Sequence, residues 1–175
     1  MKRWIIALVL VALFAVTARA EEPWDGWSSD FTDPADEVMW LSGVTSVYIS
    51  SYDGVTGGCW TNENATRTAV ELLLRGAGIS IATDGILAAS HIINIKVNGT
   101  NTGDARGCYG GVDLEFYQPL SADLIVPGAK RVVLFTPLNT AVHMTGPSMN
   151  EAVRTFAIEK TDALALRILR ARDAE

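Results

Sequence analysis

Residues 59–81, CWTNENATRTAVELLLRGAGISI, hold the clearest helix signal in the chain, together with its start, its end and one of the two cysteines. Apolar residues recur there at helical spacing and charged residues occupy the opposite side, which predicts an amphipathic helix with one buried face. Thr61 or Asn62 can cap its first turn, and Gly78 suits the left-handed conformation that ends a helix. The expected buried face comprises Ala65, Ala69, Leu72, Leu73 and Ala77, and the expected exposed face Glu63, Arg67, Glu71 and Arg75.

The first twenty residues, MKRWIIALVLVALFAVTARA, combine a basic start, an apolar run and small residues at Ala18 and Ala20. This order is typical of a secretory signal peptide, and we expect cleavage after Ala20 and a periplasmic or secreted protein. A membrane anchor is the alternative, but the apolar run is shorter than the roughly 20 residues that span a bilayer. The expected organisation is a signal peptide at 1–20, a lead-in segment with a short helix at 21–43, and a single α+β domain at 44–175.

Removal of the signal peptide makes the expected mature chain strongly acidic. The full sequence has 14 basic and 20 acidic residues and a formal net charge of −6; without Lys2, Arg3 and Arg19 it keeps 11 basic residues, and the charge becomes −9. Nucleic acids and anionic lipids bind clustered Lys and Arg, so both are disfavoured as partners. The length that remains suits one domain with its own hydrophobic core.

Cys59 and Cys108 are the only cysteines in the sequence. An exported chain passes through an oxidising compartment, where such a pair normally closes into a disulfide. A metal pair or a reactive thiol is the alternative, but two cysteines without a CxxC motif or a histidine cluster make a poor metal site. The 48 residues between the two cysteines would make the disulfide worth about 4 kcal/mol in the loop-entropy treatment.

An aspartate followed by a proline marks a helix start before the first strand. Asp33 suits the cap and Pro34 the first helical position. After Gly43, β-branched and aromatic residues in the run VTSVYIS favour a strand. We therefore expect an extended lead-in at 21–33 clamped by Trp24 and Trp27, a helix at 35–41 with Met39 and Trp40 directed inward, and a strand at 44–50.

The second half of the chain alternates apolar and polar residues and ends in a long helix. Residues 91–97 alternate most regularly, and turn-forming residues at 98–107 predict a long hairpin tip before alternation resumes at 110–117. Ser148 and Glu151 have capping-box spacing ahead of the helix. The other expected elements are strands at 79–83, 131–136 and 140–145, a connection at 119–128, and a helix at 150–173 that buries Val153, Ala157, Thr161, Leu164 and Ile168.

These elements predict an α+β fold, with a single layer of mainly antiparallel sheet, two amphipathic helices packed on one face and one disulfide. The segments RTAVELLLRGAGI and VDLEFYQP, with a cysteine-bearing turn between them and a closing helix after them, resemble small, uncharacterised exported bacterial α+β proteins. The resemblance extends over roughly residues 44–170. It implies this architecture and no activity, cofactor or catalytic residue.

The sequence offers few groups for catalysis. Phosphate loops, H-E-x-x-H, G-x-S-x-G and EF-hand spacing do not occur, and His91 and His143 are the only acid–base groups that titrate near neutrality. His91 falls on an apolar strand face, which favours a core or sheet-edge histidine. Asp113 and Glu115 share a strand face, and paired carboxylates can cleave glycosides, but a solvated sheet face also explains them. We predict no catalytic residue, cofactor or metal.

The hairpin tip is the predicted binding site, because function concentrates on loops held by a rigid scaffold and this tip is long and polar. Its side-chain oxygens suit calcium only weakly, since the loop lacks carboxylate density. A tolerated surface insertion is the alternative. The residues concerned are Asn98, Thr100, Asn101, Asp104, Arg106 and Tyr109.

Two classes of function remain open from the sequence. The favoured one is an exported, non-enzymatic envelope protein that acts as a binding or assembly module for an unidentified protein or small ligand. The alternative is a small secreted hydrolase that uses the Asp113 and Glu115 face or His91. A concave pocket that gathers these groups would favour the enzyme, whereas scattered, solvated carboxylates would favour the binding module.

Overall fold

The chain has an α+β fold, described here by a computed structural model that covers residues 27–103, 107–123, 130–146 and 148–174. The predicted signal peptide and Trp24 lie outside these residues. The helices are α2 (Pro34–Ser42), α3 (Glu63–Gly76) and α4 (Asn150–Asp173), with a 3₁₀ turn at η1 (Ile86–Ala88). The strands are β1 (Ser28–Ser29), β2 (Ser46–Val55), β3 (Ser80–Ile81), β4 (His91–Asn101), β5 (Cys108–Asp123) and β6 (Lys130–Gly146).

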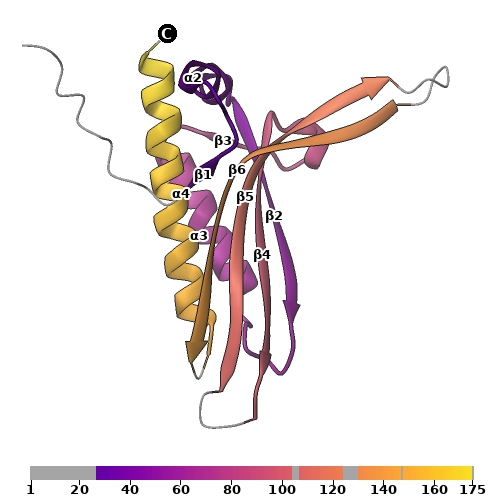
Figure 1. Cartoon of the computed structure of the whole chain (residues 1–175), viewed down its shortest axis with the longest axis vertical. Helices are drawn as coiled ribbons and strands as arrows, with labels where there is room; N and C mark the ends of the chain where they lie inside the picture. Colours follow the sequence, from indigo (N-terminus) through magenta and orange to yellow (C-terminus); the bar gives the residue numbers. More distant parts are fainter. Residues whose placement is uncertain (1–26, 104–106, 124–129, 147, 175) are drawn as a thin grey trace, which may run out of the picture.

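The strands form one mixed sheet with the order β1-β6-β5-β4-β2-β3 (Figure 1). β4, β5 and β6 are antiparallel neighbours, as the alternating sequence predicts. β2 instead runs parallel to both β4 and β3. The parallel pairs arise because α3 lies between β2 and the next strands in the chain, and a helical crossover returns the chain in the same direction. The antiparallel part is therefore extended by a parallel edge.

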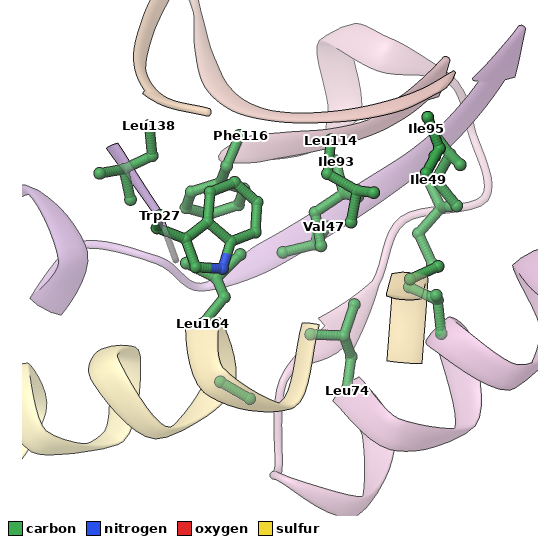
Figure 2. Close-up of a cluster of buried hydrophobic side chains, with 14 of the residues drawn as sticks. Trp27, Val47, Ile49, Leu74, Ile93, Ile95, Leu114, Phe116, Leu138 and Leu164 are labelled. Carbon is green, nitrogen blue, oxygen red and sulfur yellow. The ribbon is translucent and has the colours of Figure 1, made fainter. Parts of the chain in front are cut away.

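The hydrophobic core lies between the sheet and the helices that cover one of its faces (Figures 1 and 2). Leu74 of α3 and Leu164 of α4 meet the inward side chains of β2, β4 and β5 there, and all of these side chains are buried. Trp27 is buried in the same core and its Nε1 donates to the Lys160 carbonyl at 2.8 Å, as expected for a clamp on the lead-in. Among the described residues, no helix has the length and apolar character needed to cross a membrane.

The two long helices differ in how well their buried faces follow the sequence pattern. The predicted stripe of α4, from Val153 to Ile168, is buried as expected. The face predicted for α3 is wrong, because Ala65 is exposed and Leu72 is 64% exposed. α3 buries Thr66, Val70 and Leu74 instead, with Leu73 and Ala77 partly buried. Small alanines set the predicted face, whereas the larger Val70 and Leu74 remove more apolar area from water when they turn inward.

The β4–β5 hairpin is longer than predicted and its tip is shorter. Residues 98–101 continue β4 and pair with β5, so that Thr100 lies opposite Tyr109 and Asn101 opposite Cys108. Gly110 permits this pairing, because a Cβ there would lie 2.2 Å from the Asn98 carbonyl oxygen. The predicted connection at 119–128 is also wrong at its start, because β5 continues to Asp123. The strands predicted at 131–136 and 140–145 are parts of one strand, β6.

The helix ends follow the predicted caps only in part. The Asp33 carboxylate accepts from the Ala35 N–H at 2.8 Å, as expected for the cap of α2. Trp40 is partly buried as predicted, but Met39 is 66% exposed because it lies on the opposite side of a short helix that buries Leu41. Gly78 adopts the predicted left-handed conformation after α3, with a φ of 73°.

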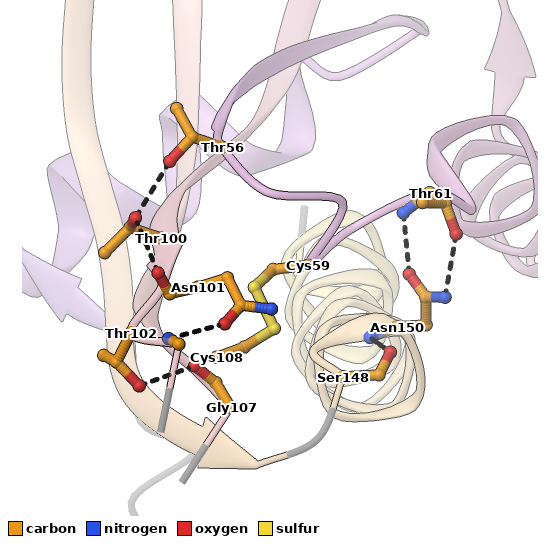
Figure 3. The surroundings of a disulfide bond; sticks show 11 residues. Thr56, Cys59, Thr61, Thr100, Asn101, Thr102, Gly107, Cys108, Ser148 and Asn150 are labelled. Atoms are coloured by element: carbon orange, nitrogen blue, oxygen red, sulfur yellow. Dashed lines mark hydrogen bonds between the residues drawn. A yellow bond between two sulfur atoms is a disulfide. The ribbon is translucent and has the colours of Figure 1, made fainter. Parts of the chain in front are cut away.

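Cys59 and Cys108 form the predicted disulfide, with Cα atoms 5.6 Å apart (Figure 3). The bond connects the segment before α3 to the start of β5. The first turn of α4 is fastened to the same segment, because the Met149 N–H donates to the Cys59 carbonyl at 2.9 Å and the Asn150 amide exchanges two hydrogen bonds with Thr61.

The predicted capping box at the start of α4 does not form. Met149 is the cap residue and makes no side-chain capping bond. The Ser148 hydroxyl instead accepts from the Asn150 N–H at 3.1 Å, and Glu151 lies within 3.9 Å of Arg154 (Figure 3). The hydrogen bonds between the Asn150 side chain and Thr61, rather than a capping box, hold the first turn of α4 in position.

Candidate functional site

The candidate site is a cavity of about 480 Å³ at the end of the sheet where β4 begins. Its walls come from three parts of the chain, namely the lead-in, α2 and the strands β4 and β5. Other cavities of similar size exist, but this one combines aromatic walls with a buried histidine, a combination typical of ligand sites. The lining residues are Phe31, Asp36, Met39, Trp40, Gly43, His91 and Gln118.

Aromatic rings fix the position of His91 in the wall. The imidazole stacks on Phe116, with ring centroids 5.1 Å apart and an interplanar angle of 16°. Trp40 meets both rings edge-on, at 4.7 Å from His91 and 5.2 Å from Phe116. The Trp40 Nε1 donates to the Gln118 Oε1 at 3.0 Å, which joins α2 to β5. These contacts make the wall rigid, because each ring is held from more than one side.

The Ser90 hydroxyl lies beside the imidazole and makes three hydrogen bonds with the backbone. It donates to the Ser46 carbonyl at 2.7 Å and accepts from the N–H groups of Thr45 and Ser46, both at 3.0 Å. The His91 Nδ1 lies 3.1 Å from the same oxygen, and its role in that contact depends on the tautomer. In the neutral ring one nitrogen carries the proton and the other is an acceptor.

The Nε2 atom of His91 is buried and has no hydrogen-bond partner among the described residues. Burial lowers the pKa of His91 from 6.5 to about 4, because the charged imidazolium loses its hydration. The imidazole is therefore neutral near pH 7. A buried polar nitrogen without a partner costs free energy, and a hydrogen-bond partner brought by a bound molecule would remove that cost.

The carboxylate pair predicted on β5 lies on the other face of the sheet from His91. Glu115 accepts from the Lys96 Nζ at 2.6 Å and from the Asn94 Nδ2 at 3.3 Å. Asp113 occupies the strand position opposite Lys96. On this face of the sheet Glu115 forms an ion pair with Lys96, and both side chains are half-buried. His143 is exposed on β6, opposite Gly111.

The residues of the predicted binding loop mostly hold the hairpin together. The Thr56 hydroxyl donates to the Thr100 Oγ1 at 2.9 Å, and the Asn101 Oδ1 accepts from the Gly103 N–H at 2.8 Å (Figure 3). Asn98 is exposed on β4, and Tyr109 is 53% exposed on β5. Asp104 and Arg106 lie outside the described residues. None of the described side chains of this set lines the cavity at His91, and binding by them remains a prediction.

Sequence reasoning identified His91 and the inward Trp40 but missed the other walls of the cavity. Phe31 and Gln118 lie far from His91 in the sequence and have no motif spacing. Ser90, whose hydroxyl lies beside the His91 ring, immediately precedes His91 in the sequence, and this adjacency is the one local signal of the site. Within the described residues, no cluster of three or more His, Cys, Asp or Glu is arranged to hold a metal ion.

The sequence matches no protein-family profile and no curated protein. Among solved structures, the chain is distantly similar to two crystal structures of the PelC dodecamer from Paraburkholderia phytofirmans. One, a point variant, has 12% identity and a TM-score of 0.40 over 73% of this chain and 89% of that chain. The other has 14% identity and a TM-score of 0.39 over 72% and 89%. Similarity at this level does not bear on the function of this chain.

Proposed function

We propose that the protein is an exported, non-enzymatic binding module of the cell envelope whose cavity at His91 holds a small ligand. The observation that carries the proposal is the buried, unpartnered Nε2 of His91 in an aromatic wall. Export is supported by the pattern of residues 1–20 and by the Cys59–Cys108 disulfide, which forms in oxidising compartments.

The ligand class follows from the walls of the cavity. The rings of Phe31 and Trp40 line the cavity, which favours an apolar ring in the ligand. We place the imidazole proton on Nδ1, which lies 3.1 Å from the Ser90 hydroxyl, so that Nε2 is the acceptor and the ring of the ligand should carry an O–H or N–H donor. A cavity of about 480 Å³ suits a small molecule rather than a folded partner.

The hydrolase alternative has less support from the geometry. It needs His91 or the β5 carboxylates to act together on one substrate, yet Glu115 is paired with Lys96 on the opposite face of the sheet. A histidine whose pKa is about 4 is also a weak base near neutrality. These observations favour binding over acid–base chemistry at this site.

Nuclear magnetic resonance on untagged, ¹⁵N-histidine-labelled protein tests the proposal, because His91 and His143 are the only two histidines. The probes are phenol and anisole, which share a ring and differ in the O–H donor. We expect phenol to shift the His91 Nε2 resonance and to bind at least several-fold more tightly than anisole, because only phenol can donate to Nε2.

The exposed His143 provides the internal control, and its resonances should stay unchanged. His91→Phe is the matched variant, since it keeps a ring against Phe116 and removes the acceptor, and it should abolish the preference for phenol. Equal shifts with both probes, or a shift confined to His143, would contradict the proposed site.

A further inference from the structure

One edge of the sheet is open along most of β2. β3 pairs with β2 only at Ser46 and Val47. Residues 48–55 pair with β4 on one side and with no other described strand. In Figure 1 this part of β2 forms the lower outer border of the sheet. An open edge of this length is a template for an added strand.

The direction of the backbone groups on this edge follows from one hydrogen bond. The Val47 carbonyl accepts from the Ala82 N–H at 2.9 Å, so the polar groups of Val47 point away from β4. Alternate residues along a strand point their N–H and C=O groups to the same side. Ile49, Ser51 and Asp53 therefore present their amides to the open edge, where no described residue accepts from them.

A cavity of about 450 Å³ adjoins this edge on the helix side of the sheet. Trp60 is only 3% exposed, and its Nε1 has no hydrogen-bond partner among the described residues. The Oδ1 of Asn62 is buried and unpartnered in the same way. Trp60 and Asn62 thus line one cavity, and each keeps a buried polar atom without a partner among the described residues. The lining residues are Asp53, Trp60, Thr61, Asn62, Glu63, Asn64 and Ala65.

The cavity is acidic. Asp53 and Glu63 form no ion pair with the described residues. One oxygen of Asp53 accepts from the Val55 N–H at 2.9 Å, and Glu63 accepts from the Ser51 hydroxyl. Both carboxylates are thereby held beside the open edge, and a cation placed there would meet two uncompensated charges.

We infer that β2 binds an extended, basic peptide segment of a partner protein by strand addition. The segment pairs with the amides of Ile49, Ser51 and Asp53 and directs a Lys or Arg into the cavity between Asp53 and Glu63. Side chains beside each other in neighbouring strands lie on the same face of a sheet, so a residue opposite Asp53 reaches this cavity. The inference is independent of the small ligand proposed at His91, which lies at the other end of the parallel β2–β4 pair.

The probe is the acetylated and amidated peptide VKVKVKV, whose lysines fall on one face of a strand. Hydrogen exchange measured by NMR on the full mature chain should show at least tenfold slower exchange of the Ile49, Ser51 and Asp53 amides at saturating peptide. The amides of Ser50 and Tyr52, which face β4, should not change. The same peptide with N-methylated backbone amides keeps the charge but cannot pair, and it should bind at least tenfold more weakly.

The charge requirement is tested with the Asp53→Asn/Glu63→Gln double variant, whose amide oxygens still accept the bonds from Val55 and Ser51. It should bind VKVKVKV at least tenfold more weakly, and the peptide VEVEVEV should not bind the unaltered chain. Equal binding of the N-methylated peptide would overturn strand addition and leave only non-specific charge attraction. Unchanged binding by the double variant would overturn the cationic site. Failure of phenol to bind at His91 would affect neither result.

Discussion

His91 combines a stacked ring with a buried nitrogen, Nε2, that has no hydrogen-bond partner among the described residues. Its Nδ1 lies beside the Ser90 hydroxyl, and its ring is enclosed by Trp40 and Phe116. The sequence predicted a core or sheet-edge histidine from the apolar face on which it lies. It could not predict the aromatic enclosure, because Trp40 reaches His91 only through the packing of α2 on the sheet and Phe116 only through the pairing of β5 with β4.

The low pKa of His91 predicts a specific dependence of stability on pH. The unfolded histidine takes up a proton near pH 6.5, whereas the folded one stays neutral until about pH 4. The unfolded state therefore binds more protons in this window, and the free energy of unfolding falls as the pH falls from 6.5 to 4. The full effect is about 3 kcal/mol at pH 4.

Urea unfolding at pH 7 and at pH 4.5, with His91→Phe as the matched variant, measures this effect. The decrease in stability should be larger for the unaltered chain than for the variant, since both share the carboxylates that also titrate. A His91 pKa near 6.5 in an NMR titration, or identical pH profiles for the two proteins, would show that the imidazole is not held neutral by burial.

At the scale of elements, the sequence predicted best where a single pattern governs a long segment. The 24-residue helix α4 buries its predicted stripe, and the two cysteines pair as expected. The buried face of α3 was predicted wrongly because most of the residues that defined it are alanines, whose small side chains remove little apolar area from water when they are buried. The length of the hairpin was missed because Gly99 was assigned to the turn, whereas a glycine there allows β4 and β5 to approach closely.

The disulfide should stabilise three elements at once, because Cys59 also anchors the first turn of α4 through Met149. We predict that the Cys59→Ala/Cys108→Ala double variant loses up to about 4 kcal/mol of unfolding free energy. The melting temperature should fall by roughly 10 °C. Calorimetry checks this value, and hydrogen exchange of the α4 amides at residues 150–153 should rise.

The double variant leaves no free thiol, so the unaltered chain treated with a reducing agent is its matched control. The two should melt at the same temperature. An unchanged melting temperature in both would show that the crosslink adds nothing to the contacts between Asn150 and Thr61.

At the scale of the whole molecule, the fold class and the disulfide were predictable from the sequence, and the mixed sheet was not. The parallel pairing of β2 with β4 depends on the path taken by α3, and the alternation within each strand contains no information about its neighbour. Both proposed sites depend on that pairing, since it creates the open edge of β2 and brings Ser46 beside Ser90. A motif search cannot find sites that arise in this way.

Export is the claim on which the envelope function rests, and the intact mass of the protein recovered from the periplasm or the medium tests it most directly. The expected mass is that of residues 21–175 less the two hydrogens lost when Cys59 and Cys108 are joined. Thiol titration of the denatured, unreduced protein should then find no free thiol. A protein that stays in the membrane fraction with Met1 retained would contradict export, and an exported protein with two reactive thiols would contradict the disulfide.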